Sequence, residues 1–289
     1  QYTQCLQPNA FDNSHLECGV PPGFGTGLTA ILRVELLDST IDTLQLAEKL
    51  GYIAPQLDDV LGADSMITRG GEAITIRGQN FGPAHVSQDL WLTVTYSRRR
   101  VSTLATDQMY TATGCQITVN HTEILCQSVA GVGGGLYWKI EVGQQESEPG
   151  NMLTSYARPI VLGVVLSEER SIAVEACDSS LLNARDGGLL STVGGEVIKI
   201  TGKNLGAGAA GRLEVVYGRA LNATLTAVSY AASGCYVSSD HDEVQCFTAP
   251  GSGAEHSWKI VVAGLESDVT NSNMTITHYR PPQLHGVQA

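Results

Sequence analysis

The sequence predicts an all-β protein made of tandem β-sandwich repeats, and three observations lead to this prediction. First, its 289 residues contain 32 Gly and only 16% charged residues, and short runs rich in Val, Ile, Leu and Thr lie between clusters of Gly, Asn and Ser. Second, one set of anchor residues occurs more than once along the chain. Third, six of the seven cysteines form three locally spaced pairs.

Internal similarity is the strongest of these signals. Residues 70–82 (GGEAITIRGQNFG) return as residues 194–206 (GGEVIKITGKNLG). The anchors that follow keep their order in both copies: Trp91–Tyr96 and Leu213–Tyr217, Tyr110–Cys115 and Tyr230–Cys235, Cys126 and Cys246, Trp138–Ile140 and Trp258–Ile260. Chance does not keep so many anchors in step, so each copy is one structural repeat.

A closing Tyr followed by Pro marks the repeat ends at residues 52–55, 156–159 and 279–282. The expected boundaries are 1–54 for the C-terminal half of a repeat, 55–158 for a complete repeat, 159–281 for a complete repeat with an insertion around 165–190, and 282–289 for the start of another. The Tyr-to-Pro junctions are too short for flexible linkers, which predicts repeats stacked end to end with restricted hinging.

The two ends of the chain fit the same scheme. Residues 1–54 have no GGE-type strand, and half a sandwich leaves an open apolar face and an unpaired edge. We therefore expect the chain to be a window from a longer array. The missing strands would come from another chain or from an upstream segment.

Within a repeat, hydrophobic residues alternate with a period of two. In 138–142 the apolar Trp, Ile and Val face one way and the Lys and Glu the other, and 74–77 follows the same rule. Gly78 and Gly82 are expected to bracket a sharp turn in which Gly alone tolerates a positive φ. Trp138 and Trp258 are expected to be core anchors, with carbohydrate-binding platforms as the alternative.

These residues resemble the IPT/TIG family, the immunoglobulin-like module of plexins, hepatocyte-growth-factor-receptor-like kinases and fibrocystins, found also in Rel-type and early-B-cell transcription factors. The matching motifs are a proline-led first strand, GGE-x-I-x-I-x-G-x-N-[FL]-G, a Cys pair around a polar loop, a Gly-rich turn, an apolar strand and a closing Tyr. The resemblance covers essentially the whole chain. It implies tandem immunoglobulin-like (IPT/TIG) β-sandwich repeats.

The cysteine pairs predict three local disulfides, each closing a hairpin: Cys5–Cys18, Cys115–Cys126 and Cys235–Cys246. No CxxC motif supports a zinc site, and a free-thiol interpretation leaves the repetition unexplained. Disulfides require an oxidising compartment. Cys177 in the insertion is left unpaired, and two interpretations stay open: a buried thiol, or a disulfide to another chain or segment.

Three N-glycosylation sequons agree with export from the cell: Asn120-His121-Thr122, Asn222-Ala223-Thr224 and Asn273-Met274-Thr275. Asn120 is the strongest candidate. It lies between paired cysteines at a polar loop tip, where a glycan would be solvated.

Several functions are disfavoured. A net charge of −12 argues against nucleic-acid binding, and Arg98–Arg100 is interpreted as a solvated turn. No apolar run reaches the roughly 18 to 20 residues of a membrane span, and Gln1–Gln4 does not resemble a signal peptide.

The sequence contains no catalytic motif in the structural context that the motif requires, and we expect no enzyme activity, cofactor or metal. HExxH and GxSxG are absent. Gly206–Gly211 fits GxGxxG, but a strand follows it where a dinucleotide site needs a helix. Asp240–Glu243 is expected to be an exposed loop tip, with a calcium site as the alternative.

The leading hypothesis is a non-catalytic structural array of a secreted or cell-surface glycoprotein, serving as ectodomain, matrix or surface filament. The resemblance to fibrocystin-type proteins adds a possible ciliary surface. The alternatives are a receptor or adhesion module with a specific protein ligand, and an accessory domain of a secreted carbohydrate-active enzyme. Expected partners are other repeats of the same longer chain, further copies or protein ligands, and N-glycans.

Overall fold

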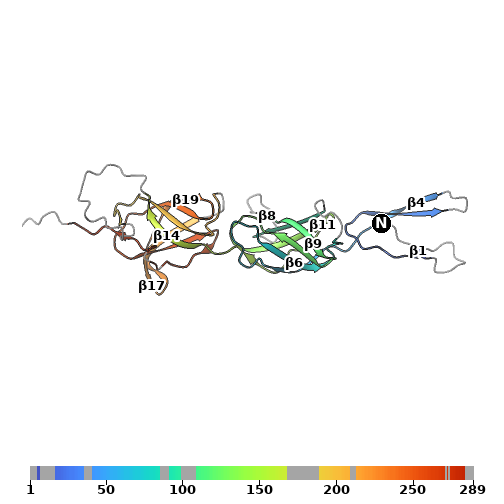
Figure 1. The fold of residues 1–289 in the computed structure, drawn as a ribbon, viewed down its shortest axis with the longest axis horizontal. Coiled ribbons are helices and arrows are strands. Elements are labelled where there is room, and N and C mark those ends of the chain that lie inside the picture. Colours follow the sequence, from blue (N-terminus) through green and yellow to red (C-terminus); the bar gives the residue numbers. More distant parts are fainter. Residues whose placement is uncertain are drawn as a thin grey trace, which may run out of the picture. The chain divides into compact units, whose positions relative to one another are not determined.

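The fold was analysed in a computed structural model (Figure 1). The structure describes residues 5–6, 17–35, 41–84, 91–98, 109–167, 189–208, 213–270, 272 and 274–283. These residues form the strands β1 to β23 and contain no helix, and therefore no helix that could cross a membrane. The all-β prediction is confirmed.

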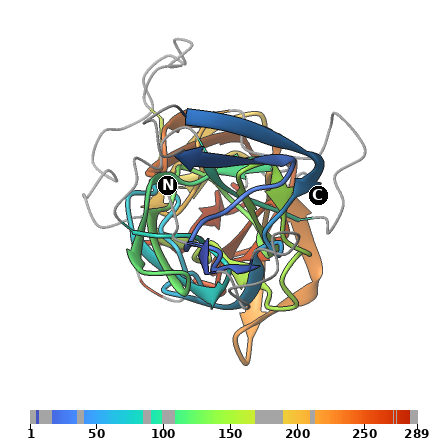
Figure 2. The same ribbon diagram turned by 90° about the vertical axis from the view of Figure 1, so that its right-hand side faces the viewer.

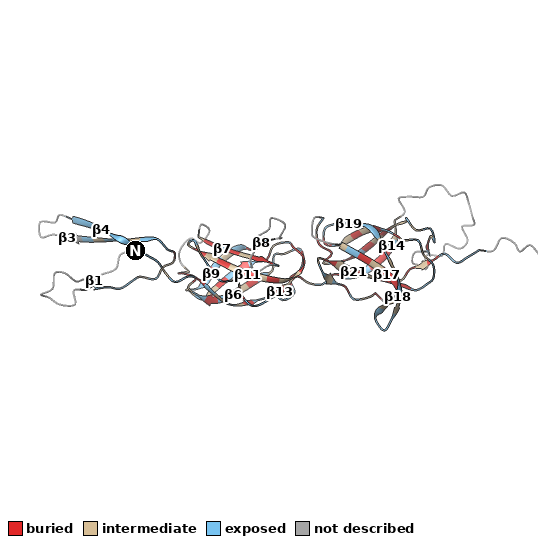
Figure 3. Cartoon of the chain, turned by 180° about the vertical axis from the view of Figure 1, so that it is seen from behind, coloured by how far each residue is buried: buried red, intermediate tan, exposed pale blue. Residues whose placement is uncertain are grey.

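Two short antiparallel hairpins open the chain. Strand β1 (Cys5–Leu6) pairs with β2 (Glu17–Cys18), and β3 (Leu28–Glu35) pairs with β4 (Ile41–Leu50). Every residue of β4 is exposed, and Leu44 and Leu50 are 63% and 50% accessible (Figure 3). This hairpin has an apolar side that no described strand covers.

The first sandwich contains two antiparallel sheets. One has the order β5-β6-β10-β9, and the other the order β12-β11-β7-β8 with β13 also on β11. The strands are β5 (Gln56–Leu61), β6 (Ala73–Gln79), β7 (Leu92–Ser97), β8 (Met109–Thr111), β9 (Thr113–Val119), β10 (Glu123–Gln127), β11 (Gly134–Val142), β12 (Gln145–Glu146) and β13 (Thr154–Ser155).

The second sandwich repeats this plan, with sheets β14-β16-β20-β19 and β18-β17-β21-β22 and a parallel pair β15-β23. Its strands are β14 (Ile160–Leu166), β15 (Leu189–Leu190), β16 (Val197–Lys203), β17 (Leu213–Leu221), β18 (Thr224–Ala231), β19 (Ser233–Ser239), β20 (Glu243–Phe247), β21 (His256–Val262), β22 (Leu265–Glu266) and β23 (His278–Tyr279). The β17–β18 hairpin is longer than β7–β8 and projects away from its sheet (Figures 1 and 2).

The inward-facing residues are the ones that the alternation predicts (Figure 3). In the first sandwich Ile74, Ile76, Trp138 and Ile140 are all fully buried. In the second sandwich the four residues at the same repeat positions, Ile198, Ile200, Trp258 and Ile260, are equally buried. The two tryptophans are therefore core anchors, as the sequence predicted.

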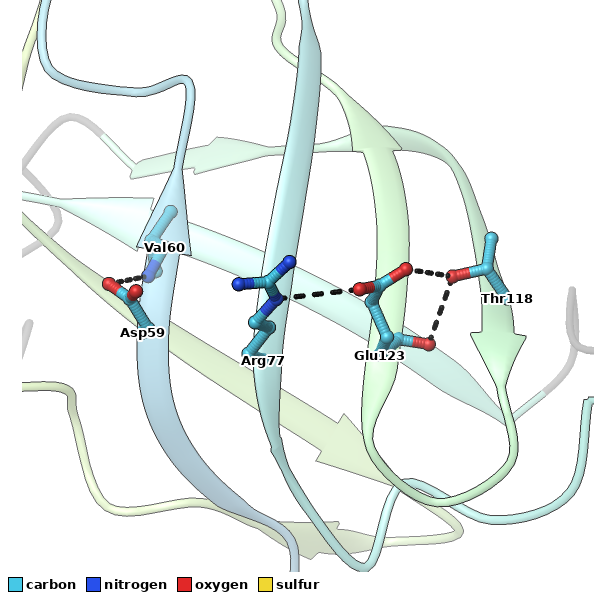
Figure 4. A network of polar contacts seen from close by, with 5 residues as sticks. All are labelled: Asp59, Val60, Arg77, Thr118 and Glu123. Atoms are coloured by element: carbon cyan, nitrogen blue, oxygen red, sulfur yellow. Dashed lines mark hydrogen bonds and ion pairs between the residues drawn. The ribbon is translucent and has the colours of Figure 1, made fainter.

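The outward-facing residues of β5, β6, β9 and β10 carry a row of polar groups (Figure 4). Arg77 Nε donates to Glu123 Oε2 at 3.4 Å, and Thr118 Oγ1 donates to Glu123 Oε1 at 2.9 Å. Asp59 accepts a 2.8 Å bond from the Val60 amide. Exposed pairs of this kind contribute roughly 0–1 kcal/mol each, so this face is a solvated surface and the stability lies in the core.

The expected turn role of Gly78 is wrong, because this residue has no positive φ. Gly82 does have a positive φ (89°), but between it and Gly78 the other left-handed residue is Asn80 (62°). Gly78 matters for a different reason: a Cβ on it would lie 2.0 Å from the Gln56 carbonyl oxygen of the neighbouring strand. Gly202 is in the same position, 2.1 Å from the Ile160 oxygen. These glycines permit close strand approach, not a turn.

Two of the expected disulfides, Cys115–Cys126 and Cys235–Cys246, are present, and each joins the two strands of one hairpin. In the first hairpin Cys18 is disulfide-bonded, and β1 places Cys5 opposite it in the strand register. Cys177 and the insertion from 168 to 188 lie outside the described residues.

Removing one of these disulfides should destabilise only its own sandwich. The paired substitution Cys115→Ala with Cys126→Ala frees a short loop, so the free energy of unfolding should fall by about 2–3 kcal/mol in the chain-entropy model. Urea titration with hydrogen exchange of both sandwiches measures this. The pair Cys235→Ala with Cys246→Ala is the matched control and should shift the second sandwich instead. An unchanged midpoint in both variants would contradict a stabilising role.

Candidate functional site

The chain divides into two compact units. The first comprises Gln1–Leu61, Ala73–Gln127 and Tyr137–Met152, and the second comprises Gly62–Glu72, Ser128–Leu136 and Leu153–Ala289. Within each unit, residues at a Tyr-to-Pro junction, and a glycine-flanked loop that precedes the junction, contact the repeat that follows in sequence. We call these contacts the repeat joints, and they are the best-formed candidate site.

In the first unit, the joint centres on Phe24. Its ring stacks on Trp91, with centroids 3.7 Å apart and planes inclined by 15°. Two glycines make room for it. A Cβ on Gly143 would lie 2.7 Å from the Phe24 ring, and a Cβ on Gly82 would lie 3.1 Å from it. The joint is thus an aromatic plug in a glycine-lined socket.

Hydrogen bonds hold the chain around this plug. The Tyr52 amide donates to the Gly25 carbonyl at 2.8 Å, and the Tyr52 hydroxyl donates to the Pro21 carbonyl at 2.6 Å. Gln145 Nε2 donates to the Tyr52 carbonyl at 2.7 Å. The closing Tyr of residues 1–54 therefore fixes both the plug loop and the strand turn beside it.

In the second unit, Val132 takes the place of Phe24. It is the middle residue of Gly131-Val132-Gly133, as Phe24 is of Gly23-Phe24-Gly25. Val132 is 3% exposed and belongs to the hydrophobic cluster that contains Trp258. The third copy of the loop has Ser252 at this position, and this residue is exposed. The two apolar middle residues are thus covered, Phe24 in part and Val132 fully, whereas the polar Ser252 is exposed.

The Asn of the repeated G-x-N-[FL]-G motif ties the junction to the turn in both repeats. Asn80 Nδ2 donates to the Ala54 carbonyl at 3.1 Å, and Asn204 Nδ2 donates to the Arg158 carbonyl at 3.3 Å. Both residues have a left-handed φ near 60°. Ala54 and Arg158 each precede the proline that opens the next repeat.

The turn at 240–242 supplies further contacts in the second unit. His241 Nδ1 is 2.8 Å from Thr68 Oγ1, and both residues are buried. Burial lowers the pKa of His241, and the nearby Arg69 acts in the same direction. Arg69 also pairs with Asp242, but both side chains are about half exposed, so this pair contributes little. The expectation of a fully exposed loop tip is wrong for His241.

The described residues provide no site for a metal ion. They contain no group of three His, Cys, Asp or Glu side chains that could hold a metal ion. The GxGxxG stretch begins after strand β16 and is followed by strand β17. Arg98 is exposed, and its two arginine neighbours lie outside the described residues.

Two of the three sequon asparagines lie on exposed turns. Asn120 lies between β9 and β10, and its Oδ1 accepts a 2.9 Å bond from the Ala84 amide. Asn222 lies in the tight turn between β17 and β18, where it and Ala223 both have positive φ. Asn273 is outside the described residues. Glycosylation of these sites stays a prediction.

Two antiparallel sheets around a buried Trp, with a hairpin disulfide, define an immunoglobulin-like β-sandwich module. Residues 64–156 match the model of the IPT/TIG domain family. This segment of the chain is therefore an IPT/TIG domain, as the sequence motifs predicted.

Solved structures with distant similarity include the plexin A4 extracellular region (14% identity, TM-score 0.29, covering 78% of this chain and 18% of that one). Another is SGBP-B from a xyloglucan utilization locus of Bacteroides uniformis (15%, TM-score 0.25, covering 75% and 48%). A third is a structure with a xylogluco-oligosaccharide (14%, TM-score 0.29, covering 82% and 44%). The chain spans less than half of each of these. Comparison with curated protein sequences gives no match.

Sequence reasoning missed both the plug and the Asn tie. The Gly-x-Gly loops are expected from the sequence as glycine-rich turns, but that expectation assigns no role to their middle residue. Phe24, Val132 and Ser252 differ at that position, which is the signal that could have revealed the joint.

The plug should be required for an ordered first joint. Phe24→Ala removes the ring stack with Trp91, a loss of about 0.5–1.5 kcal/mol beyond area burial. We expect a red shift of Trp91 fluorescence and faster proteolysis near Tyr52. Ile53→Ala is the matched control, because Ile53 is 78% exposed beside the same junction. Equal proteolysis of the two variants would show that Phe24 does not secure the joint.

Proposed function

We propose that this chain is a non-catalytic structural segment of a secreted or cell-surface glycoprotein, in which immunoglobulin-like repeats form an array with restricted hinging. The repeat joints carry this proposal. In each compact unit an apolar residue of a glycine-flanked loop packs against the next repeat: Phe24 is half-buried on Trp91, and Val132 is buried. Asn80 and Asn204 each donate to the carbonyl group just before the junction proline. Domains joined by flexible linkers would have few contacts of this kind between them.

The proposed repeats keep the boundaries read from the sequence: 1–54, 55–158, 159–281 and 282–289. The uncovered side of β3–β4 supports the first boundary. Leu28 is 39% exposed, whereas Leu136, at the same place in the next repeat, is fully buried. The β3–β4 hairpin therefore has the alternation of a sandwich strand pair, and no strand in the described part of the chain covers it.

The proposed location is extracellular or at the cell surface, and the hairpin disulfides support it because such bonds persist in oxidising compartments. Exposed sequon turns agree with this location. A ciliary surface is part of the proposal only through the fibrocystin resemblance.

Scattering of the intact chain tests the array. For wild type, small-angle X-ray scattering in solution should fit one narrow distribution of sizes. Val132→Ser, which copies the exposed Ser252 of the third loop, should broaden that distribution without unfolding either sandwich. Ser252→Val is the control and should leave the distribution unchanged. A broad distribution for wild type would reject restricted hinging.

Glycosylation tests the proposed compartment separately. When the chain is secreted from a eukaryotic host, Asn120→Gln should lower the intact mass by one N-glycan, because Asn120 is exposed on a turn. Asn222→Gln serves as the comparison at a tighter turn. A wild-type chain without glycan on Asn120 would remove this support.

A second candidate function is a protein-binding module, and strand β14 favours it. Ile160, Leu162 and Val165 are 47%, 50% and 53% exposed on this edge strand. At the first two of these positions, β5 has Gln56 and Asp58. Apolar side chains on a sheet edge favour pairing with another chain. Ile160→Gln with Leu162→Asp would then abolish binding of a ligand and leave the scattering unchanged.

A further inference from the structure

The second sandwich contains a buried histidine where the first has a leucine. His256 and Leu136 each lie two residues before the core tryptophan of their repeat, on strands β21 and β11. Leu136 is fully buried and His256 is 4% exposed. A titratable side chain therefore occupies a core position that a hydrocarbon fills in the sister domain.

The imidazole lies within an aromatic cluster. Its ring meets Tyr217, Tyr230 and Tyr279 edge-on, with centroids 6.1, 5.5 and 5.3 Å apart and interplanar angles of 83°, 85° and 77°. These tyrosines come from β17, β18 and β23. The ring thus contacts three different strands of the second sandwich.

Neither ring nitrogen has a hydrogen-bond partner within the described part of the chain. The titratable groups facing the ring are the three tyrosines and, near by, His278. Glu255 precedes His256, but its carboxylate is paired with Arg219 at 4.0 Å and both of these side chains are exposed. Glu196 acts on Tyr217 and Tyr279 of the cluster, but its carboxylate pairs with Arg280 at 3.9 Å. Among the described residues, no carboxylate is paired with the His256 ring to stabilise a positive charge on it.

The same residue holds the closing segment of the sandwich. The His256 amide donates to the Thr277 carbonyl at 2.9 Å, and the Thr277 amide donates back at 3.1 Å. Next to it, the Tyr279 amide donates to Gly253 at 2.9 Å, and the Tyr279 hydroxyl is 2.7 Å from that of Tyr217. Displacing the His256 ring would disturb both the tyrosine cluster and strand β23.

We propose that His256 makes the second sandwich acid-sensitive, so that protonation of its buried imidazole releases the closing strand β23 while the first sandwich stays closed. This goes beyond the proposed array function and does not depend on it. The His256 side chain is neutral and packed in the core at neutral pH, and it becomes charged at acid pH.

The direction follows from linkage. Burial lowers the pKa of His256 in the folded chain. The backbone carbonyl groups of Ser252 and Gly253 oppose this effect in part, and the nearby His278 adds to it. In the unfolded chain the pKa is about 6.5. The contribution of neutral His256 to the stability of the second sandwich is therefore fully present above about pH 6.5. This contribution is lost as the pH falls from there toward the pKa of the folded chain. In this range the equilibrium constant for closure falls, by at most tenfold per pH unit for one proton.

Hydrogen exchange of the intact chain between pH 7.5 and 5 tests this, after correction for intrinsic exchange rates. The reporter is the Tyr279 amide, and the control is the Tyr156 amide, which makes the matching 2.9 Å bond to Gly133. In wild type the Tyr279 amide should lose protection below pH 6.5, by at most tenfold per pH unit, and the Tyr156 amide should not. His256→Leu, the residue of the sister domain, should remove the difference.

Two outcomes would overturn the proposal. One is an acid loss of protection at Tyr279 that persists unchanged in His256→Leu, because another group would then be responsible. The other is an NMR titration of the wild-type His256 ring with a pKa at or above 6.5, which would mean that the cluster stabilises the charged form. The titration needs no variant, so the proposal stays testable if His256→Leu fails to fold.

Discussion

The stacked Trp–Tyr pair at the centre of each sandwich is the interaction on which the rest of the fold depends. Trp138 lies directly opposite Tyr96 in the register of β11 and β7, and their rings are 4.2 Å apart. Trp258 and Tyr217 repeat this arrangement at 4.1 Å. Replacing a buried aromatic residue by Ala costs about 3–5 kcal/mol, which is a large share of the roughly 5–15 kcal/mol that holds an ordinary domain together. The opposite sheet supplies smaller side chains to the core, namely aliphatic residues and one disulfide cysteine, Cys126 or Cys246, so the aromatic pair fixes the spacing of the two sheets.

A short chain of contacts connects this core to the repeat joints. The closing tyrosines, Tyr156 and Tyr279, each donate a 2.7 Å hydrogen bond to a loop carbonyl, of Val129 and Ala249 respectively. In each repeat that carbonyl lies just before the Gly-x-Gly loop. The tyrosine therefore fixes the loop that presents the plug residue, and the plug reaches its socket only because the sandwich behind it is closed. In the first two loops this contact couples the order of the joint to the stability of the sandwich, whereas in the third loop Tyr279 fixes a turn whose middle residue, Ser252, is exposed.

The sequence could predict what depends on repetition and periodicity, since both are properties of the chain itself. Alternation in 74–77 and 138–142 correctly predicted which residues are buried, and the paired cysteines correctly predicted two hairpin bonds. It could not predict that Gly78 serves close strand approach, because this depends on the Gln56 carbonyl in a strand that is distant in sequence. The role of Asn80 was hidden for a similar reason: a left-handed Asn is compatible with many turns, and its partner Ala54 carries no sequence signal. Phe24 looked like an ordinary loop residue, since its socket consists of glycines and one tryptophan that come together only in the folded unit.

His256 shows how two competing effects of one environment can be ranked. A protonated imidazole among tyrosines gains cation–π attraction, which reaches about 2 kcal/mol in desolvated sites. Against it stands the loss of hydration, which costs several kcal/mol for a buried ion even after relaxation. The cost of desolvation outweighs the cation–π attraction, so the neutral ring is favoured and a charge in this position opposes closure. Leu136, at the same position of the first sandwich, cannot take up a proton, so acid adds no charge there. At this core position the two domains therefore differ in their response to acid, and the histidine lies where the closing strand joins the aromatic core.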